Sequence, residues 1–373
     1  AYVAGQAYAI RALCYLNLAT WFSRAPYNSL TGASRWNEPC VPVYTTGTSI
    51  DTGGQPRESL RTVYGRIDQD IDRAIELLEK ARETTLAENN KSHINLYVAL
   101  GIKSRACLAE GDWDGAFKAA KRVIDEGGYA VGTKSDLTGG MNSLDKQNVM
   151  WGAGIQVADQ AGGYAGFFTH MDNKEGAYAK SAPKLISKQL YNRISATDIR
   201  RDWWDPSDKE SPYVSKKFSF ANVASFLGDY IYMRVEEMYF TAAEAALRLD
   251  DLKSARELMN TVMAERDPGY SANNRSGTLL GATTTTWTGS FLENILTHRR
   301  IELWGEYGRL FDVRRLGQGI DRRTDDGFSE ECISMMNRRN VNITKADTYD
   351  WVLTIPKAEL DANPNINEED QNP

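Results

Sequence analysis

Long hydrophobic runs, clustered cysteines and an excess of positive charge are all missing from this sequence of 373 residues. No stretch approaches the roughly 18 consecutive apolar residues of a transmembrane helix, so the sequence predicts a water-soluble chain. The formal net charge is −6, whereas binding to nucleic acid needs a concentrated field of Lys and Arg. We therefore expect a neutral or cationic ligand and no nucleic acid.

Cysteine and histidine are too sparse for a metal centre or a disulfide framework. The four cysteines show no CxxC spacing, and Cys14 and Cys107 fall in helical patterns where a buried thiol acts as an apolar filler. The three histidines, His93, His170 and His298, lie far apart and outside any HExxH arrangement. We expect no metal site.

Motifs that would commit the chain to catalysis are also missing. The Gly-rich pieces at 152–154 and 162–166 lack the residue order that cradles phosphates, and no GxSxG elbow is present. Among 50 Asp and Glu residues some pair must lie close, so a glycoside hydrolase stays open without positive support. We predict no catalytic residues and no cofactor.

The periodic apolar pattern predicts a mainly α fold. Apolar residues at spacings of three and four indicate helices over about 2–22, 57–86, 92–110, 112–127, 231–249, 251–265 and 290–304. Turns at Gly111-Asp112 and Asp250-Asp251 make two copies of one helix hairpin, which favours tetratricopeptide-type pairs. The chain opens inside a helical pattern, so we expect it to start partway into a longer protein.

Between the hairpins, residues 128–229 are rich in Gly, Ser and Asn, with short strands expected at about 149–157 and 213–220. We predict a single domain in which 1–127 and 230–373 form a helical scaffold. The stretch 128–229 is then a large irregular, loop-rich insertion that binds the ligand, because long loops on a rigid scaffold commonly carry binding sites.

The segment 298–315 packs arginines and acids among large apolar residues, which could mark an anion site. A guanidinium group can donate two parallel hydrogen bonds to a carboxylate in fixed geometry, so we favour a structural role for these arginines and acids. The acids Glu302, Glu306 and Asp312 are expected to pair, in a mainly buried network, with Arg299, Arg300, Arg309, Arg314 or Arg315.

This segment resembles the ERRxELxxEGxRxxDLxRxG signature of the SusD/RagB family, with His298 in place of the first Glu and one residue inserted between Glu306 and Gly308. The matching positions are Arg299, Arg300, Glu302, Leu303, Glu306, Gly308, Arg309, Asp312, Arg314 and Gly317. Four further segments are similar to the family in the same order, at 5–18, 232–245, 353–365 and 371–373.

The resemblance implies a non-catalytic protein that binds oligosaccharide or polysaccharide at the cell surface of Bacteroidota. It also implies a lipid anchor in the outer membrane, outside the given sequence, and a TonB-dependent transporter of the SusC type as partner. Peptide or glycopeptide capture by the same architecture is the alternative within the family. A protein-binding tetratricopeptide scaffold is a further one.

Sugar sites combine flat aromatic rings with polar side chains, and the chain has 9 Trp and 18 Tyr. In the predicted loops, this combination of rings and polar neighbours marks the candidate positions. The glycan-binding candidates are Trp36, Arg35, Asn37, Tyr27, Trp203, Trp204, Tyr164, Phe167 and Trp287. Of the adjacent pair Trp203 and Trp204 we expect one exposed ring, sharing a face with Trp36.

Overall fold

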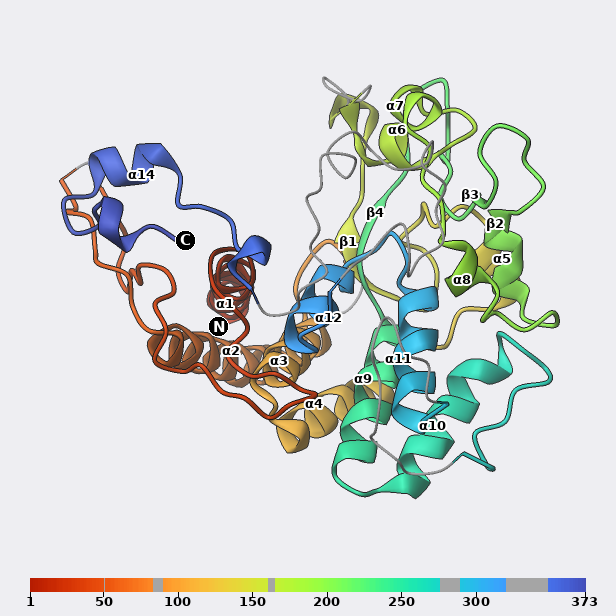
Figure 1. Ribbon diagram of the computed structural model, residues 1–373, viewed down its shortest axis with the longest axis horizontal. Helices are drawn as coiled ribbons and strands as arrows, with labels where there is room; N and C mark the ends of the chain where they lie inside the picture. The colour runs from red at the N-terminus through yellow and green to blue at the C-terminus, as the bar shows by residue number, and fades with distance from the viewer. Residues whose placement is uncertain (50, 83–89, 160–164, 276–288, 320–347) are drawn as a thin grey trace.

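The computed structural model describes residues 1–49, 51–82, 90–159, 165–275, 289–319 and 348–373. A row of helices runs along one side of the molecule, and a loop-rich region rises from its far end (Figure 1). The mainly helical fold class is confirmed.

Each long helix lies inside its predicted range, because apolar periodicity reports which face of a helix is buried. These helices are α1 (Tyr2–Phe22), α2 (Leu60–Ala81), α3 (Leu96–Glu110), α4 (Trp113–Glu126), α9 (Val235–Arg248), α10 (Leu252–Ala264) and α11 (Phe291–Glu302). One boundary was wrong: residues 231–234, expected to be helical, belong to strand β4 (Tyr230–Arg234), which pairs with another strand.

The helices pack mainly on their neighbours in order, with α1 on α2, α2 on α3, α3 on α4, α4 on α9, and α9 on both α10 and α11. Fully buried alanines such as Ala116, Ala120, Ala242 and Ala245 lie at these contacts and let the helix backbones approach closely. The resulting core is continuous along the row.

The two predicted hairpins share their turn chemistry. Gly111 (φ 78°) and Asp250 (φ 61°) both adopt the left-handed conformation that ends a helix. The next residue, Asp112 or Asp251, caps the following helix by accepting a hydrogen bond at 3.0 Å from the backbone N–H three residues on. The hairpins are confirmed, whereas their tetratricopeptide type stays a prediction.

The α-helices in the described part of 128–229 have at most five residues. They are α5 (Lys134–Thr138), α6 (Phe167–Met171), α7 (Ala177–Ser181) and α8 (Lys188–Tyr191). Strand β1 (Val149–Ala153) pairs antiparallel with β4, with irregular register around Trp151, and β2 (Trp204–Asp205) pairs with β3 (Val214–Ser215). The division into scaffold and insertion stays a prediction, but β4 runs directly into α9 and so ties this region to the helices.

The C-terminal segments return to the first helix. After α12 (Arg309–Arg315), the chain from 348 onward contains α14 (Lys357–Ala362), and near its end the Asn372 side chain donates to the Phe22 carbonyl at 2.9 Å. None of the described helices is long and apolar enough to cross a membrane.

Three described cysteines, Cys14, Cys40 and Cys107, are free thiols. Cys107 is buried as predicted, but Cys14 is exposed, so its assignment as a core filler was wrong. The buried residues Ala9, Ala12, Leu16 and Ala19 define the packed side of α1, and position 14 lies on the opposite side.

Candidate functional site

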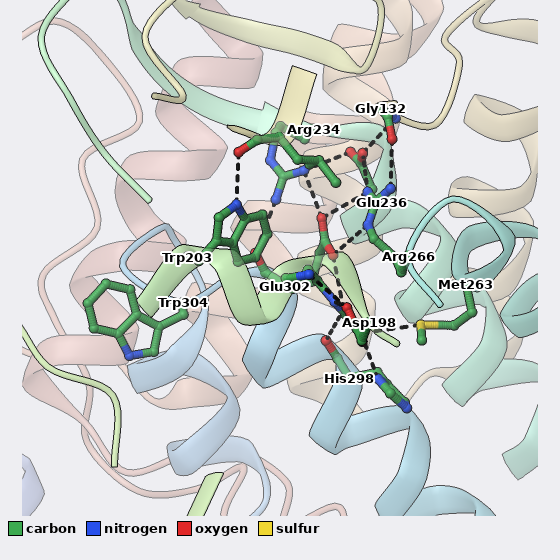
Figure 2. Close-up of polar contacts among 12 residues, drawn as sticks. Gly132, Asp198, Trp203, Arg234, Glu236, Met263, Arg266, His298, Glu302 and Trp304 are labelled. Atoms are coloured by element: carbon green, nitrogen blue, oxygen red, sulfur yellow. Dashed lines mark hydrogen bonds and ion pairs between the residues drawn. The ribbon is translucent and has the colours of Figure 1, made fainter. Parts of the chain in front are cut away.

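The segment 298–315 forms a buried ion-pair network centred on Glu302 (Figure 2). The Glu302 carboxylate accepts hydrogen bonds from Arg200 (3.0 Å), Arg266 (2.9 and 3.0 Å) and Arg234 (3.1 Å), and these side chains are fully buried. Burial alone would raise the pKa of Glu302, but the guanidinium groups of Arg266, Arg234 and Arg200 hold that pKa well below its ordinary value.

The prediction for this segment is confirmed in its main point and wrong in some partners. Asp312 pairs as expected with Arg299 (2.8 Å) and Arg315 (2.9 Å). The arginines around Glu302 come instead from 200, 234 and 266, because the helix faces the loop-rich region and the end of α10. The acids thus tie the segment to the elements around it, which is the structural role that the sequence favoured.

The expectation for Trp203 and Trp204 was wrong, because both rings are only 1% exposed. They lie edge to face at 5.8 Å, and the Trp203 indole N–H donates to the Leu137 carbonyl at 2.8 Å. The loop-rich region has a hydrophobic core of its own between α5, α8 and α11, and both rings fill it. Neither shares an exposed face with Trp36.

Trp36 is partly buried against α2, with its ring edge on Tyr64 at 5.7 Å and the Arg61 guanidinium over its face at 5.8 Å. Its neighbour Arg35 donates to the Ala25 carbonyl at 3.3 Å, and Asn37 is exposed. Ligand contact by Trp36, Arg35 and Asn37 stays a prediction.

Of the candidates Tyr27, Tyr164 and Trp287, the structure describes only Tyr27. Tyr27 packs edge to face on Trp113 at 6.2 Å, and ligand contact by Tyr27 also stays a prediction. Tyr164 and Trp287 lie outside the described residues.

Among the predicted rings that the structure describes, only Phe167 lines a concave aromatic site, a cavity of about 400 Å³ that we call the aromatic cavity. Its lining residues come from α1, α3, α6, β1, β4 and the turn after α11, so both the helices and the loop-rich region contribute to it. Six of the described lining residues are aromatic. They are Trp151, Phe167, Phe218, Tyr230, Tyr232 and Tyr307.

The rings in the aromatic cavity face one another at angles and leave surface for a ligand. Trp151 and Tyr232 lie 5.0 Å apart, Phe167 lies 5.3 Å from Phe218, and Tyr232 is 41% exposed. Exposed aromatic faces beside hydroxyl groups suit a ligand with apolar CH faces and a polar rim.

Polar groups enter the aromatic cavity from the helices. Asn17 on α1 accepts a hydrogen bond from the Tyr307 hydroxyl at 3.4 Å, and its NH2 group bonds to no described residue. The Arg105 guanidinium lies 3.9 Å from the Tyr307 ring centre, held there by Glu237 through Nε and Nη2 at 2.8 and 2.7 Å. Its Nη1 makes no hydrogen bond within the described chain, so it is available as a donor.

Glu306 lines the cavity with its charge already satisfied. Arg234 donates to its two oxygens at 2.7 and 2.8 Å, and Lys217 donates at 2.5 Å. Burial would raise the pKa of Glu306, but Arg234 and Lys217 lower that pKa below its usual value. Burial also lowers the pKa of Lys217 to about 8, although Glu306 partly opposes this.

Sequence reasoning missed most of this cavity. Trp151 fell in a predicted strand and was not among the candidates, and Tyr230 and Tyr232 fell at a predicted helix start. The pair Tyr230 and Tyr232, two residues apart, carried a strand signal, since such residues share one face of a strand. The other lining residues, such as Asn17, Arg105 and Tyr307, are far apart in sequence and give no local signal.

Two other cavities have fewer aromatic residues among their described lining residues than the aromatic cavity has. One of about 440 Å³ has three tyrosines among its described lining residues, Tyr2, Tyr97 and Tyr129. One of about 810 Å³, beside α1 and the C-terminal segments, also has three aromatic residues among those described, Tyr15, Phe22 and Tyr44. Within the described chain, no group of three or more His, Cys, Asp and Glu could hold a metal ion.

Comparison with known proteins agrees with this description. The model of the SusD family matches residues 171–373, and no curated protein matches the chain. The structure is similar to a SusD-like carbohydrate binding protein from Bacteroides vulgatus, with 26% identity and a TM-score of 0.77, covering 98% of this chain and 76% of that one.

Two further solved structures share the fold at lower identity. A SusD superfamily protein from Bacteroides thetaiotaomicron has 23% identity and a TM-score of 0.77, covering 99% of this chain and 77% of its own. Surface glycan-binding protein A from Bacteroides uniformis has 17% identity and a TM-score of 0.64, covering 99% and 78%.

Proposed function

The chain belongs to the SusD family, and from this premise we propose that it binds an oligosaccharide or a segment of a polysaccharide in the aromatic cavity without cleaving it. The observation that carries the proposal is the convergence of six aromatic side chains with Asn17 and Arg105 on one concave site. The relatives from Bacteroides vulgatus and Bacteroides uniformis are described as carbohydrate-binding and glycan-binding proteins, which supports the same class of ligand.

The absence of catalysis in this proposal is supported by the carboxylate in the cavity. A glycoside hydrolase needs a carboxylic acid with a raised pKa and a second carboxylate about 5–10 Å away. Glu306 is the one carboxylate among the described lining residues, and its neighbours lower its pKa. A group held ionised by two cations is a poor proton donor to a glycosidic oxygen.

Family membership also supports a location and a partner. In this proposal a lipid anchor holds the protein at the extracellular face of the outer membrane, and a TonB-dependent transporter of the SusC type receives the captured glycan. The protein then contributes selection and local concentration of the glycan, and the transporter contributes passage across the membrane.

A glycan array followed by calorimetric titration of each bound oligosaccharide tests the proposal. Tyr232→Ala should weaken glycan binding by about 1–3 kcal/mol, because this exposed ring offers its face to the ligand. The matched control is Tyr178→Ala, since Tyr178 is similarly exposed (43%) but lies outside the aromatic cavity, stacked on His170.

The control should bind like the original protein, and both variants should keep their thermal stability, since exposed rings support little core. The proposal fails if no glycan binds, or if Tyr232→Ala leaves the affinity unchanged. It also fails in its non-catalytic part if the bound oligosaccharide is shortened during prolonged incubation.

A further inference from the structure

We infer that the aromatic cavity selects neutral glycans and discriminates against sugars that carry carboxylate or sulfate groups. This inference rests on the proposed function and names the class of ligand at the same site. Its basis is the balance of charge in the cavity wall.

Two charged residues, Arg105 and Glu306, are found among the described residues that line the cavity, and each is neutralised from behind. Arg105 forms a two-pronged ion pair with Glu237, and both side chains are 2% exposed. Glu306 is bonded to both Arg234 and Lys217. No charge of the described wall is left without a counter-charge.

The rest of the described wall consists of aromatic and aliphatic side chains, one glycine and the amide of Asn17. An anionic group that enters such a site loses its water and gains no uncompensated cation, so its desolvation is not repaid. A neutral sugar hydroxyl has a lower cost. It can accept a hydrogen bond from Arg105 Nη1 or from the Asn17 NH2 group while its CH face lies on Tyr232 or Trp151.

The inference is tested first on the unaltered protein, with neutral and anionic hexasaccharides as probes: laminarin-, xylan- and mannan-derived oligosaccharides against oligogalacturonate and chondroitin sulfate fragments. We expect the bound probes to be neutral, and every anionic probe to bind at least ~10-fold more weakly. Affinity for the bound probe should change less than about 2-fold between roughly 20 and 500 mM NaCl, because screening acts only on charged ligands.

A second measurement uses a variant in which Arg105 has lost the negative charge of its partner Glu237. Glu237→Gln keeps the shape of the side chain but removes the counter-charge, so the wall gains a net positive group. The variant should bind the anionic probes more tightly than the unaltered protein does, by about 10-fold at low salt, and this gain should vanish at high salt. Tyr232→Ala in the same background should lower the gained binding, which places it in the cavity.

The outcomes separate this inference from the proposed function. Salt-sensitive binding of an anionic probe by the unaltered protein, lost in Tyr232→Ala, overturns the inference and leaves glycan binding standing. Binding of no glycan overturns both. If Glu237→Gln does not fold, the probe series and the salt dependence of the unaltered protein decide the matter alone.

Discussion

Two aromatic groups in this protein have opposite surroundings, although Trp304 links them by contacting both Trp204 (5.9 Å) and the cavity-lining Phe218 (6.5 Å). Trp203 and Trp204 belong to a closed core with the ion-pair network of Glu302 beside it, and both rings are fully buried. Trp151 and Tyr232 belong to the aromatic cavity, where a ring is left partly open. Abundant aromatic residues therefore do not identify a sugar site by themselves, since the same residue types fill a core when other elements close over them.

The largest expected effect concerns the ion-pair network beside the closed core. Glu302→Ala should lower the free energy of unfolding by about 5 kcal/mol, because Arg200, Arg234 and Arg266 would be left buried around an empty carboxylate position. Urea denaturation measures this change. The exposed Glu76→Ala, which removes two ion pairs at the surface of α2, serves as the control and should leave the free energy of unfolding nearly unchanged, because water already solvates these charges.

A milder outcome for Glu302→Ala would mean that water enters the network and solvates the arginines. The closed core and the aromatic cavity would then differ less in their access to water than the burial of these side chains indicates.

Trp203→Ala should follow, with a loss of about 3–4 kcal/mol in the free energy of unfolding. The ring is buried, its N–H donates to the Leu137 carbonyl, and Lys217 lies 4.4 Å from the ring centre, so the substitution removes packing, a hydrogen bond and a cation–π contact. If this variant instead remained stable and lost glycan binding, the original assignment of Trp203 to the ligand would be restored.

The closed core and the aromatic cavity also differ in how much of each could be predicted from the sequence. Helix positions were predictable, because the spacing of apolar residues directly reflects which side of each helix is covered. The side chains that meet at the aromatic cavity were not, because Asn17, Arg105, Trp151 and Tyr307 are brought together only by the packing of separate elements.

The same limit explains the errors on α1 and on the adjacent tryptophans. Helix α1 is apolar around most of its circumference, so its sequence alone did not distinguish exposed Cys14 from buried Leu16. For Trp203 and Trp204, alternation along a strand suggested opposite faces, but both faces are covered by α5, α8 and α11.

Phe167 has features of both aromatic groups, since it lines the aromatic cavity and also packs on the buried Phe168 at 5.2 Å. Phe167→Ala should weaken glycan binding by about 1–2 kcal/mol and lower the free energy of unfolding by a similar amount. Calorimetric titration and urea denaturation measure the two effects. A loss of stability with unchanged binding would remove Phe167 from the site and shift the ligand toward Trp151 and Tyr232.

The smallest expected change per step of the experiment is a gradual pH dependence at Lys217, which lies between the buried Glu302 network and the aromatic cavity. Its ammonium group donates to the Glu302 and Trp304 carbonyls at 2.7 and 2.8 Å, and to the cavity-lining Glu306. Burial lowers its pKa to about 8, below the ordinary 10.5 that the unfolded chain should show. Between these values the unfolded chain binds more protons than the folded protein, so the free energy of unfolding should rise with pH.

This contribution is complete above about pH 10.5 and is lost as the pH falls through about 8, with a slope of at most about 1.4 kcal/mol per pH unit for one proton. Comparing urea denaturation of the unaltered protein and Lys217→Met from about pH 7 to 10 isolates the slope, because tyrosines and other titrating groups are present in both. Lys118→Met, at an exposed site, should parallel the unaltered protein. If the free energy of unfolding of Lys217→Met shows the same pH dependence as that of the unaltered protein, water reaches this ammonium group. The ion-pair network would then be open to solvent where it borders the aromatic cavity.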